Sequence, residues 1–188
     1  MKINDTVIIK DDKELALLRE KSEDVKLPLS KDDEDLVLSM IQYVKDSTIE
    51  EIAKKQNLKP AVGISAIQIG IKKKIFVVVL RDENEQIIHE YALINPKIIS
   101  ESTQLSYLKY GEGCLSVENK HEGYVYRHAR IKIKAYNFFT KKEEIIKAHG
   151  YLAIVMQHEY DHLNGILYYD HISKNAPFIE KPNSICIE

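Results

Sequence analysis

Residues 157–162 read Gln-His-Glu-Tyr-Asp-His, and this stretch constrains the fold more than any other part of the chain. Side chains four residues apart lie on one face of an α-helix, so His158 and His162 can bind one cation together. The pattern His-Glu-x-x-His is a metal-binding helix motif whose glutamate serves as a general base. Glu159 is rotated by roughly 100° from His158, so it can reach a water molecule at the metal without replacing it. The sequence therefore predicts a helix here and a fold that brings a further ligand to it.

The helix predicted around this motif is apolar. Tyr151 to Leu163 carries apolar residues at helical spacing, and the segment ends at Asn164-Gly165, a common C-terminal stop. The alternative is a chance pair of histidines on a solvated helix. Burying two imidazoles and a carboxylate without a partner costs several kcal/mol, and the apolar neighbours predict burial. We therefore favour the metal site.

A third ligand is needed, because catalytic metal sites usually combine three protein ligands with one open position. The metzincin pattern fails here, since Tyr168 stands where it needs a histidine. Upstream, Cys114 lies between Gly113 and Leu115 in the stretch Glu-Gly-Cys-Leu-Ser, and its glycine neighbour indicates close backbone approach. A lone cysteine is often only a small buried apolar residue.

Two metalloenzyme classes remain open on these residues alone. In the first, Cys114 completes a Cys-His-His site. In the second, a zinc endopeptidase takes its third ligand from further along the chain, with Asp170, His171 or Glu180 as candidates. A non-catalytic structural metal domain is a third possibility. Substitution of Cys114 separates the first class from the second.

The rest of the chain predicts an α+β fold. Ser30 caps a helix expected to run to about Lys55, where Lys59-Pro60 ends it. Strands are predicted at 75–80, 87–94, 125–136 and 144–148. Strands followed by one apolar helix favour antiparallel sheets packed around a central metal-binding helix, with an N-terminal helix, in a single domain of residues 1–188.

Composition excludes several classes of protein. Apolar residues make up 44% and charged residues 30% of the chain, which is typical of a globular protein. The net charge is −2, so no basic excess indicates nucleic-acid binding. No apolar run approaches the length of a membrane span, and the first residues lack the apolar region of a secretion signal. We therefore expect a cytoplasmic enzyme.

Three segments, in this order, resemble the peptide deformylases. Residues 112–116 and 157–162 match the family signatures Glu-Gly-Cys-Leu-Ser and Gln-His-Glu-x-Asp-His in full. Residues 61–68 match the signature Gly-x-Gly-x-Ala-Ala-x-Gln at Gly63, Ala66 and Gln68. This segment departs from the family at Ala61, Ser65 and Ile67. The insert before the cysteine motif and the strand-like tail at 184–187 are similar to the type common in Gram-positive bacteria.

The resemblance implies removal of the formyl group from the formylmethionine of nascent chains, with release of formate. It implies Cys114, His158 and His162 as ligands of one divalent metal per chain, and Glu159 as the group that accepts and returns a proton. It also implies that the Gln68 side chain and the Leu115 backbone N–H donate to the oxyanion. Thiolate and imidazole ligands alone favour Zn²⁺, whereas the family implies Fe²⁺, with Ni²⁺, Co²⁺ or Zn²⁺ able to replace it.

The remaining site residues are predictions about substrate and support. Glu112 is expected to pair with Arg127 and fix the cysteine loop. Residues of the motif helix one or two turns before His158 are expected to form an apolar pocket for methionine, and two glycine-containing segments to bind the peptide backbone as an added strand. The expected substrate contacts are Val62, Gly63, Ile64, Tyr110, Gly111, Gly113, Tyr151, Ile154 and Val155. The expected partners are formylmethionyl peptides and nascent chains, with neither nucleic acid nor membrane, and the expected state is a monomer.

Overall fold

The computed structural model describes residues 3–188. The principal elements follow in chain order. They are α1 (Asp11–Leu18), α2 (Lys31–Ser47), α3 (Glu50–Gln56), β1 (Gly63–Ser65), β2 (Ile75–Arg81), β3 (Ile87–Glu101), β4 (Leu105–Leu108), β5 (Arg127–His128), β6 (Arg130–Asn137), β7 (Lys142–His149), α4 (Gly150–His162) and β8 (Ile185–Ile187). Short 3₁₀ turns stand at Asp5–Val7, Ala66–Ile69 and Tyr168–His171.

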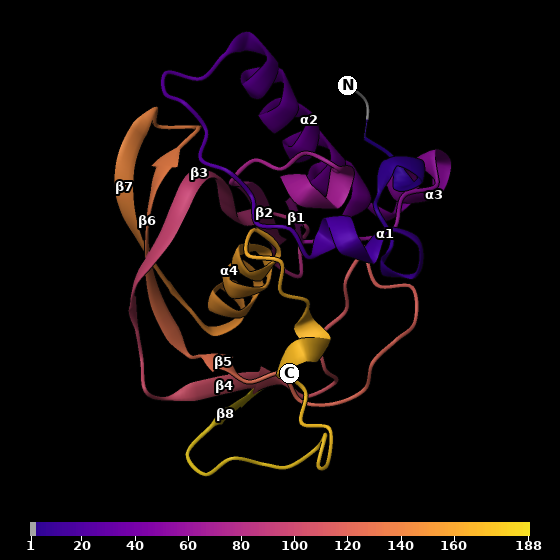
Figure 1. Ribbon diagram of the computed structural model, residues 1–188, viewed down its shortest axis with the longest axis vertical. Helices are drawn as coiled ribbons and strands as arrows, with labels where there is room; N and C mark the ends of the chain where they lie inside the picture. Colours follow the sequence, from indigo (N-terminus) through magenta and orange to yellow (C-terminus); the bar gives the residue numbers. More distant parts are fainter. Residues whose placement is uncertain (1–2) are drawn as a thin grey trace.

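Two sheets surround the motif helix. Five antiparallel strands follow the order β1-β2-β3-β6-β7, and three further strands follow the order β5-β4-β8, with β8 parallel to β4. Figure 1 shows α4 at the centre, with β3, β6 and β7 curving around one side of it and the smaller sheet lying below. This is the predicted α+β arrangement with a central helix.

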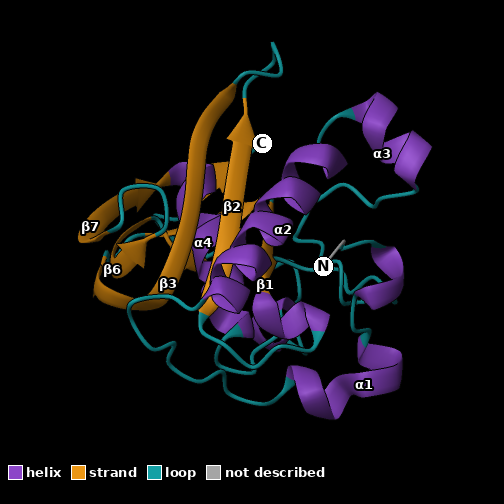
Figure 2. Ribbon diagram, turned by 90° about the horizontal axis from the view of Figure 1, so that it is seen from above, coloured by secondary structure: helices purple, strands orange, loops and turns teal. Residues whose placement is uncertain are grey.

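The strand β2 lies between two helical layers, which explains its uninterrupted apolar sequence. Ile75, Val77 and Val79 pack with residues of α2, while Phe76 and Val78 pack with residues of α4. Figure 2 shows the sheet between these two helices. Both faces of β2 are therefore buried, and the helix that carries the metal motif rests on a rigid strand.

The predicted helix at 30–55 is interrupted, so its expected extent was wrong. The Ser30 side chain caps α2 as expected, but α2 ends at Ser47 and α3 begins only at Glu50. The hydroxyl of Ser47 donates to the carbonyl of Val44 (3.0 Å) and accepts from the backbone N–H of Ala61 (3.2 Å). Local hydroxyl bonds of this kind compete with helix continuation. The interruption ties the end of α2 to the segment that leads into β1.

Of the predicted strands, one is much longer than expected and another is divided in two. The strand expected at 87–94 continues to Glu101 past Pro96, because a register shift between Ile94 and Lys97 accommodates the proline. The alternation expected over 125–136 is divided at Ala129, where the chain leaves the small sheet and enters the large one. None of the helices within residues 3–188 has both the length and the apolar character that a membrane crossing requires.

Candidate metal centre and cleft

The helix α4 positions the two predicted histidine ligands and the predicted proton carrier. The chain turns from β7 into α4 at Gly150, whose φ of 59° suits glycine. Residues 152–156 are buried without a break, so the helix has no solvated face in its middle turns. The C-terminal half then carries His158, Glu159 and His162, and all three are buried or nearly so. Their side chains are held by the packing of the helix rather than by a mobile loop.

Cys114 meets the two histidines, as the first of the two predicted classes requires. Its Sγ lies 3.2 Å from Nε2 of His162, which in turn lies 3.3 Å from Nε2 of His158. The three candidate ligand atoms all lie within 4.8 Å of one another, and residues 3–188 contain no second such cluster. One thiolate and two imidazoles suit a borderline divalent ion such as Zn²⁺ or Fe²⁺. These residues could therefore hold a metal.

The two imidazoles have opposite protonation tendencies. Burial lowers the pKa of His158, but hydrogen bonds to Cys114 and Glu112 outweigh it and hold that pKa well above its usual value. Burial and the neighbouring His158 hold the pKa of His162 well below its usual value. A cation that binds here must displace the proton of His158, so its affinity rises with pH.

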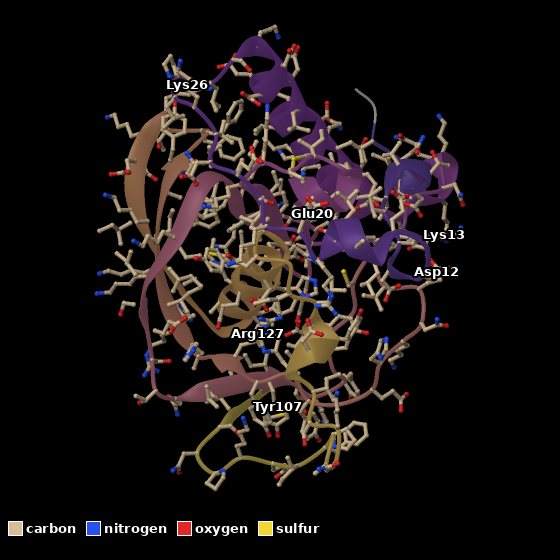
Figure 3. The ribbon with its side chains drawn as sticks, viewed as in Figure 1. Asp12, Lys13, Glu20, Lys26, Tyr107 and Arg127 are labelled. Atoms are coloured by element: carbon tan, nitrogen blue, oxygen red, sulfur yellow. The ribbon has the colours of Figure 1, made fainter. Side chains whose placement is uncertain are left out.

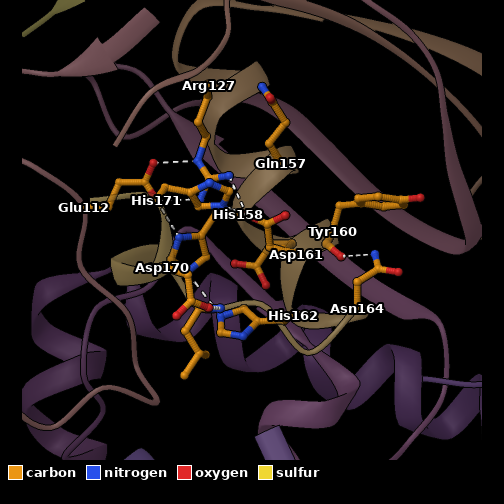
Figure 4. Close-up of polar contacts among 12 residues, drawn as sticks. Glu112, Arg127, Gln157, His158, Tyr160, Asp161, His162, Asn164, Asp170 and His171 are labelled. Atoms are coloured by element: carbon orange, nitrogen blue, oxygen red, sulfur yellow. Dashed lines mark hydrogen bonds and ion pairs between the residues drawn. The ribbon is translucent and has the colours of Figure 1, made fainter. Parts of the chain in front are cut away.

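Glu112 and Arg127 form the predicted ion pair behind the metal centre. Two nitrogens of the Arg127 guanidinium donate to the two oxygens of Glu112, at 2.6 and 2.9 Å, and a third donates to Asp161 at 2.8 Å. Oε2 of Glu112 also lies 2.8 Å from Nδ1 of His158 (Figure 4). Burial would raise the pKa of Glu112, but Arg127 and His158 lower it to about 2. The carboxylate stays ionised and fixes the ring of His158.

Glu159 lies against β1, where Gly63 and Ser65 surround its carboxylate. The Ser65 hydroxyl donates to Oε2 of Glu159 at 2.7 Å. A Cβ atom at Gly63 would lie only 2.6 Å from Oε1, so only glycine leaves room there for the carboxylate. Burial raises the pKa of Glu159, while His158 and the Ser65 hydroxyl oppose the increase. A carboxylate with a raised pKa is suited to accept and return a proton near neutral pH.

Gln68 faces the cysteine because its own amide is fixed. Its Oε1 accepts from the backbone N–H of Ser65 at 2.8 Å, which leaves Nε2 to face Sγ of Cys114 (3.5 Å) and Oγ of Ser116 (3.3 Å). Gln68 is buried, so this donor points into the site rather than into solvent. Such a preorganised donor can stabilise a developing negative charge.

A cleft of about 390 Å³ opens over these residues. Most of the predicted substrate contacts line it, namely Val62, Gly63, Gly113, Tyr151, Ile154 and Val155. Three do not. Ile64 is fully buried in the core, Tyr110 is 79% exposed, and Gly111 (φ +74°) forms a turn close to the backbone oxygen of Gly123.

Several residues that line the cleft were not predicted. Ala61 is the first residue of the segment 61–68 and Pro60 directly precedes it, so their position along the chain was a usable signal. Thr48 and Leu108 come from the end of α2 and from β4, and only the folded chain brings them to the cleft. Ser65 stood out in the sequence only as a departure from the family signature.

The alternative downstream ligands are engaged elsewhere. Asp170 pairs with Arg19, and His171 donates to Asp161 (2.7 Å), while Glu180 is exposed. None of the three belongs to the cluster of candidate ligands. The structure therefore gives no support to the alternative of an endopeptidase with one of these residues as a ligand.

Comparisons with a family model and with individual relatives all point to the deformylases. Residues 6–177 match the family model described as polypeptide deformylase. A peptide deformylase 2 of Bacillus subtilis is 46% identical over 171 residues, which cover 91% of this chain and 92% of the relative. A peptide deformylase of Oceanobacillus iheyensis is 48% identical over 164 residues, covering 87% of this chain and 88% of the relative. These organisms agree with the resemblance to the type common in Gram-positive bacteria.

Solved structures share the same arrangement. A crystal structure of peptide deformylase from Ehrlichia chaffeensis in complex with actinonin superposes with a TM-score of 0.71 at 31% identity, covering 94% of this chain and 92% of that one. A plant peptide deformylase also gives a TM-score of 0.71, at 27% identity over 89% of this chain and 80% of that one.

Proposed function

The chain belongs to the polypeptide deformylase family, so its activity is the metal-dependent removal of the formyl group from formylmethionyl peptides, and we propose that Cys114, His158 and His162 hold the metal for this reaction. The observation that carries this assignment is the meeting of one sulfur and two ring nitrogens within 4.8 Å, at the base of a cleft beside the buried carboxylate of Glu159. We propose Fe²⁺ as the ion used in the cell, with Zn²⁺, Ni²⁺ or Co²⁺ able to replace it, because thiolate and imidazole donors accept all of these.

Glu159 is the proposed proton carrier. A divalent cation held in such a site supplies a Lewis acid that lowers the pKa of water from about 15.7 toward 7. Glu159 accepts a proton from the water that attacks the formyl carbon and then returns it to the leaving amine. Because Gly63 and Ser65 confine its carboxylate, Glu159 keeps one orientation for both steps.

Two donors of the chain are proposed to stabilise the oxyanion. The Gln68 amide faces the site with its other end fixed by the Ser65 backbone, and the Leu115 backbone N–H follows the cysteine directly. Losing one donor of this kind typically costs about 3 kcal/mol of transition-state stabilisation.

Substrate selection follows from the walls of the cleft. Tyr151, Ile154 and Val155 present apolar surface beside the metal ligands, which suits an unbranched methionine side chain. The strand β1 stands at one end of the five-stranded sheet, so a peptide can bind along it as an added strand. This mode tolerates many downstream sequences. Competition by peptides with altered first residues tests the pocket, and indifference to that residue would refute it.

We also propose a cellular location and a class of partner. Nascent formylmethionyl chains are made in the cytoplasm, which supports that location, and the substrate is a peptide rather than a nucleic acid. The single catalytic domain of residues 1–188 and the monomeric state remain predictions.

Release of formate from a formyl-Met peptide, with the acetyl-Met peptide as control, tests the function. Glu159→Gln should fold and retain its metal but lose activity by about 10²- to 10⁴-fold, since it removes the proton carrier. Glu143→Gln, on the exposed face of β7, is the matched control and should retain full activity. Cys114→Ala should lose the metal. Retention of metal by Cys114→Ala, or of activity by Glu159→Gln, would contradict the proposed roles.

A further inference from the structure

A segment of three residues near the N-terminus bonds to both loops that carry the proposed oxyanion donors. The backbone N–H of Ile9 donates to the carbonyl of Gln68, and that of Asp11 donates to the carbonyl of Ser116, each at 2.8 Å. Between them, the ammonium group of Lys10 donates to the carbonyl of Leu115. Residues 9–11 therefore join the turn that holds Gln68 to the loop that holds Cys114.

Among the lysines that form ion pairs within residues 3–188, Lys10 is the most buried, because its side chain is only 15% exposed. Burial lowers its pKa, as does the nearby Lys59, while Glu118, whose carboxylate lies 3.8 Å away, partly opposes them. Withdrawing an ammonium group from water costs free energy unless the group gains a partner. The hydrogen bond that compensates Lys10 goes to the carbonyl of Leu115, the residue that follows the candidate metal ligand, and the Glu118 carboxylate is a more distant ion-pair partner.

The Leu115–Ser116 peptide links Lys10 to the metal centre. Its carbonyl accepts from Lys10, while its N–H, on Ser116, donates to Sγ of Cys114 at 3.4 Å. A cation at the carbonyl polarises the peptide and strengthens the N–H as a donor to the sulfur. The same contact restricts rotation at Leu115, whose own N–H is the proposed oxyanion donor. One side chain thus orients two groups of the site.

We propose that Lys10 is a positioning residue for deformylation. The backbone bonds of Ile9 and Asp11 hold Lys10 in place, and its ammonium group fixes the Leu115–Ser116 peptide. This contact sets the direction of the Leu115 N–H and the environment of the Cys114 sulfur. This inference rests on the proposed function and deepens it. Lys10 does not line the cleft and is not one of the candidate metal ligands, so its loss should affect turnover more than substrate binding. Small displacements of positioned groups can reduce rates about 100-fold.

The test compares Lys10→Met, Lys10→Arg and the control Lys13→Met. Lys13 lies in α1 with its side chain on the outer surface (Figure 3), so its replacement removes the same charge without touching the site. With the nickel-loaded enzyme and a formyl-Met peptide, Lys10→Met should lower kcat about 10- to 100-fold while KM changes less than about threefold. Lys10→Arg, which keeps a cationic donor, should recover most of kcat, and Lys13→Met should match the unaltered protein.

Amide hydrogen exchange of the metal-free proteins supplies a readout that does not depend on activity. Lys10→Met should speed exchange at Asp11 and Ser116 by about tenfold or more and leave the amides of α4 unchanged, because only the contacts around residues 9–11 are loosened. If Lys10→Met folds poorly, exchange in Lys10→Arg tests the proposal instead. Because Lys10→Arg keeps a cationic donor, its exchange at Asp11 and Ser116 should equal that of the unaltered protein.

Each result supports or overturns the proposal. Equal kcat for Lys10→Met and Lys13→Met would overturn it, as would unchanged exchange at Asp11 and Ser116. A Lys10→Arg variant as slow as Lys10→Met would show that a cation at the Leu115 carbonyl is not what matters. If the unaltered protein released no formate, the proposed function would fail. The exchange experiment would still show whether Lys10 fixes the Leu115–Ser116 peptide.

Discussion

Oε2 of Glu112 lies 2.8 Å from Nδ1 of His158, although the two residues are 46 positions apart in the chain. Arg127 holds the same carboxylate by two further bonds. The contact leaves Nε2 of His158 turned toward the other two candidate ligands. Residues behind the candidate metal ligands thus fix the ring of His158, a role that usually affects both metal affinity and activity.

Arg127→Met should destabilise the metal-free protein by about 3–5 kcal/mol, because it leaves the carboxylates of Glu112 and Asp161 without their buried partner. Urea unfolding followed by circular dichroism measures this change. Retention of nickel against a chelator should also fall about 10- to 100-fold. Arg130→Met, on the exposed face of β6, is the control and should change stability by less than about 0.5 kcal/mol. Equal losses for the two variants would contradict the role of Arg127.

The depressed pKa of Glu112 predicts a pH dependence of stability. The carboxyl has an ordinary value of 4.5 and a folded-state pKa of about 2, so its stabilising effect is complete above the unfolded value and is lost as pH falls toward the folded one. Between pH 6 and pH 3 this group alone should reduce the free energy of unfolding by about 2 kcal/mol.

Glu112→Gln isolates that contribution, since the amide does not titrate. The difference in unfolding free energy between the metal-free protein and this variant should be largest near neutral pH and should shrink as pH falls. A difference that stays constant from pH 6 to pH 3 would show that Glu112 is not held ionised by Arg127 and His158.

Parts of this site were predictable because they follow local rules. The spacing of His158 and His162, the apolar turns of α4 and the cysteine motif each leave a trace within a few residues. The contacts of Ser65 with Glu159 and of Lys10 with Leu115 join residues 94 and 105 positions apart, and no periodicity records them. The end of α2 at Ser47 was missed for a related reason, since the hydroxyl that competes with the helix also bonds to Ala61. The sequence thus predicted the cluster of candidate ligands and the Glu112–Arg127 pair behind it, but not the contacts that Ser65 and Lys10 make.

Gly63→Ala should lower kcat about 100-fold with the fold and the metal retained. A Cβ atom there would lie 2.6 Å from Oε1 and 2.9 Å from Cδ of Glu159, so the carboxylate must move away from the position it needs. Gly113→Ala adds the same methyl group where no atom lies within 4 Å, and it serves as the control for folding and metal content. Steady-state kinetics of nickel-loaded enzyme give the result. A kcat within about threefold of the unaltered protein would mean that Glu159 tolerates displacement.

Ser65→Ala restores the residue that the family signature has at this position and removes the hydroxyl that donates to Oε2 of Glu159 at 2.7 Å. That bond lowers the pKa of Glu159 against the larger effect of burial, so its loss should raise the pKa. A base must be ionised to accept a proton, and the acid limb of the profile of kcat/KM against pH should therefore move to higher pH. Near pH 7 the variant should be only a few-fold slower, because Gly63 still confines the carboxylate. Ser65→Thr, which keeps a hydroxyl, should leave the limb near its original position if it folds. A profile that does not move in Ser65→Ala would mean that the hydroxyl bonds mainly to the Glu159 carbonyl, which lies 2.9 Å from the same oxygen.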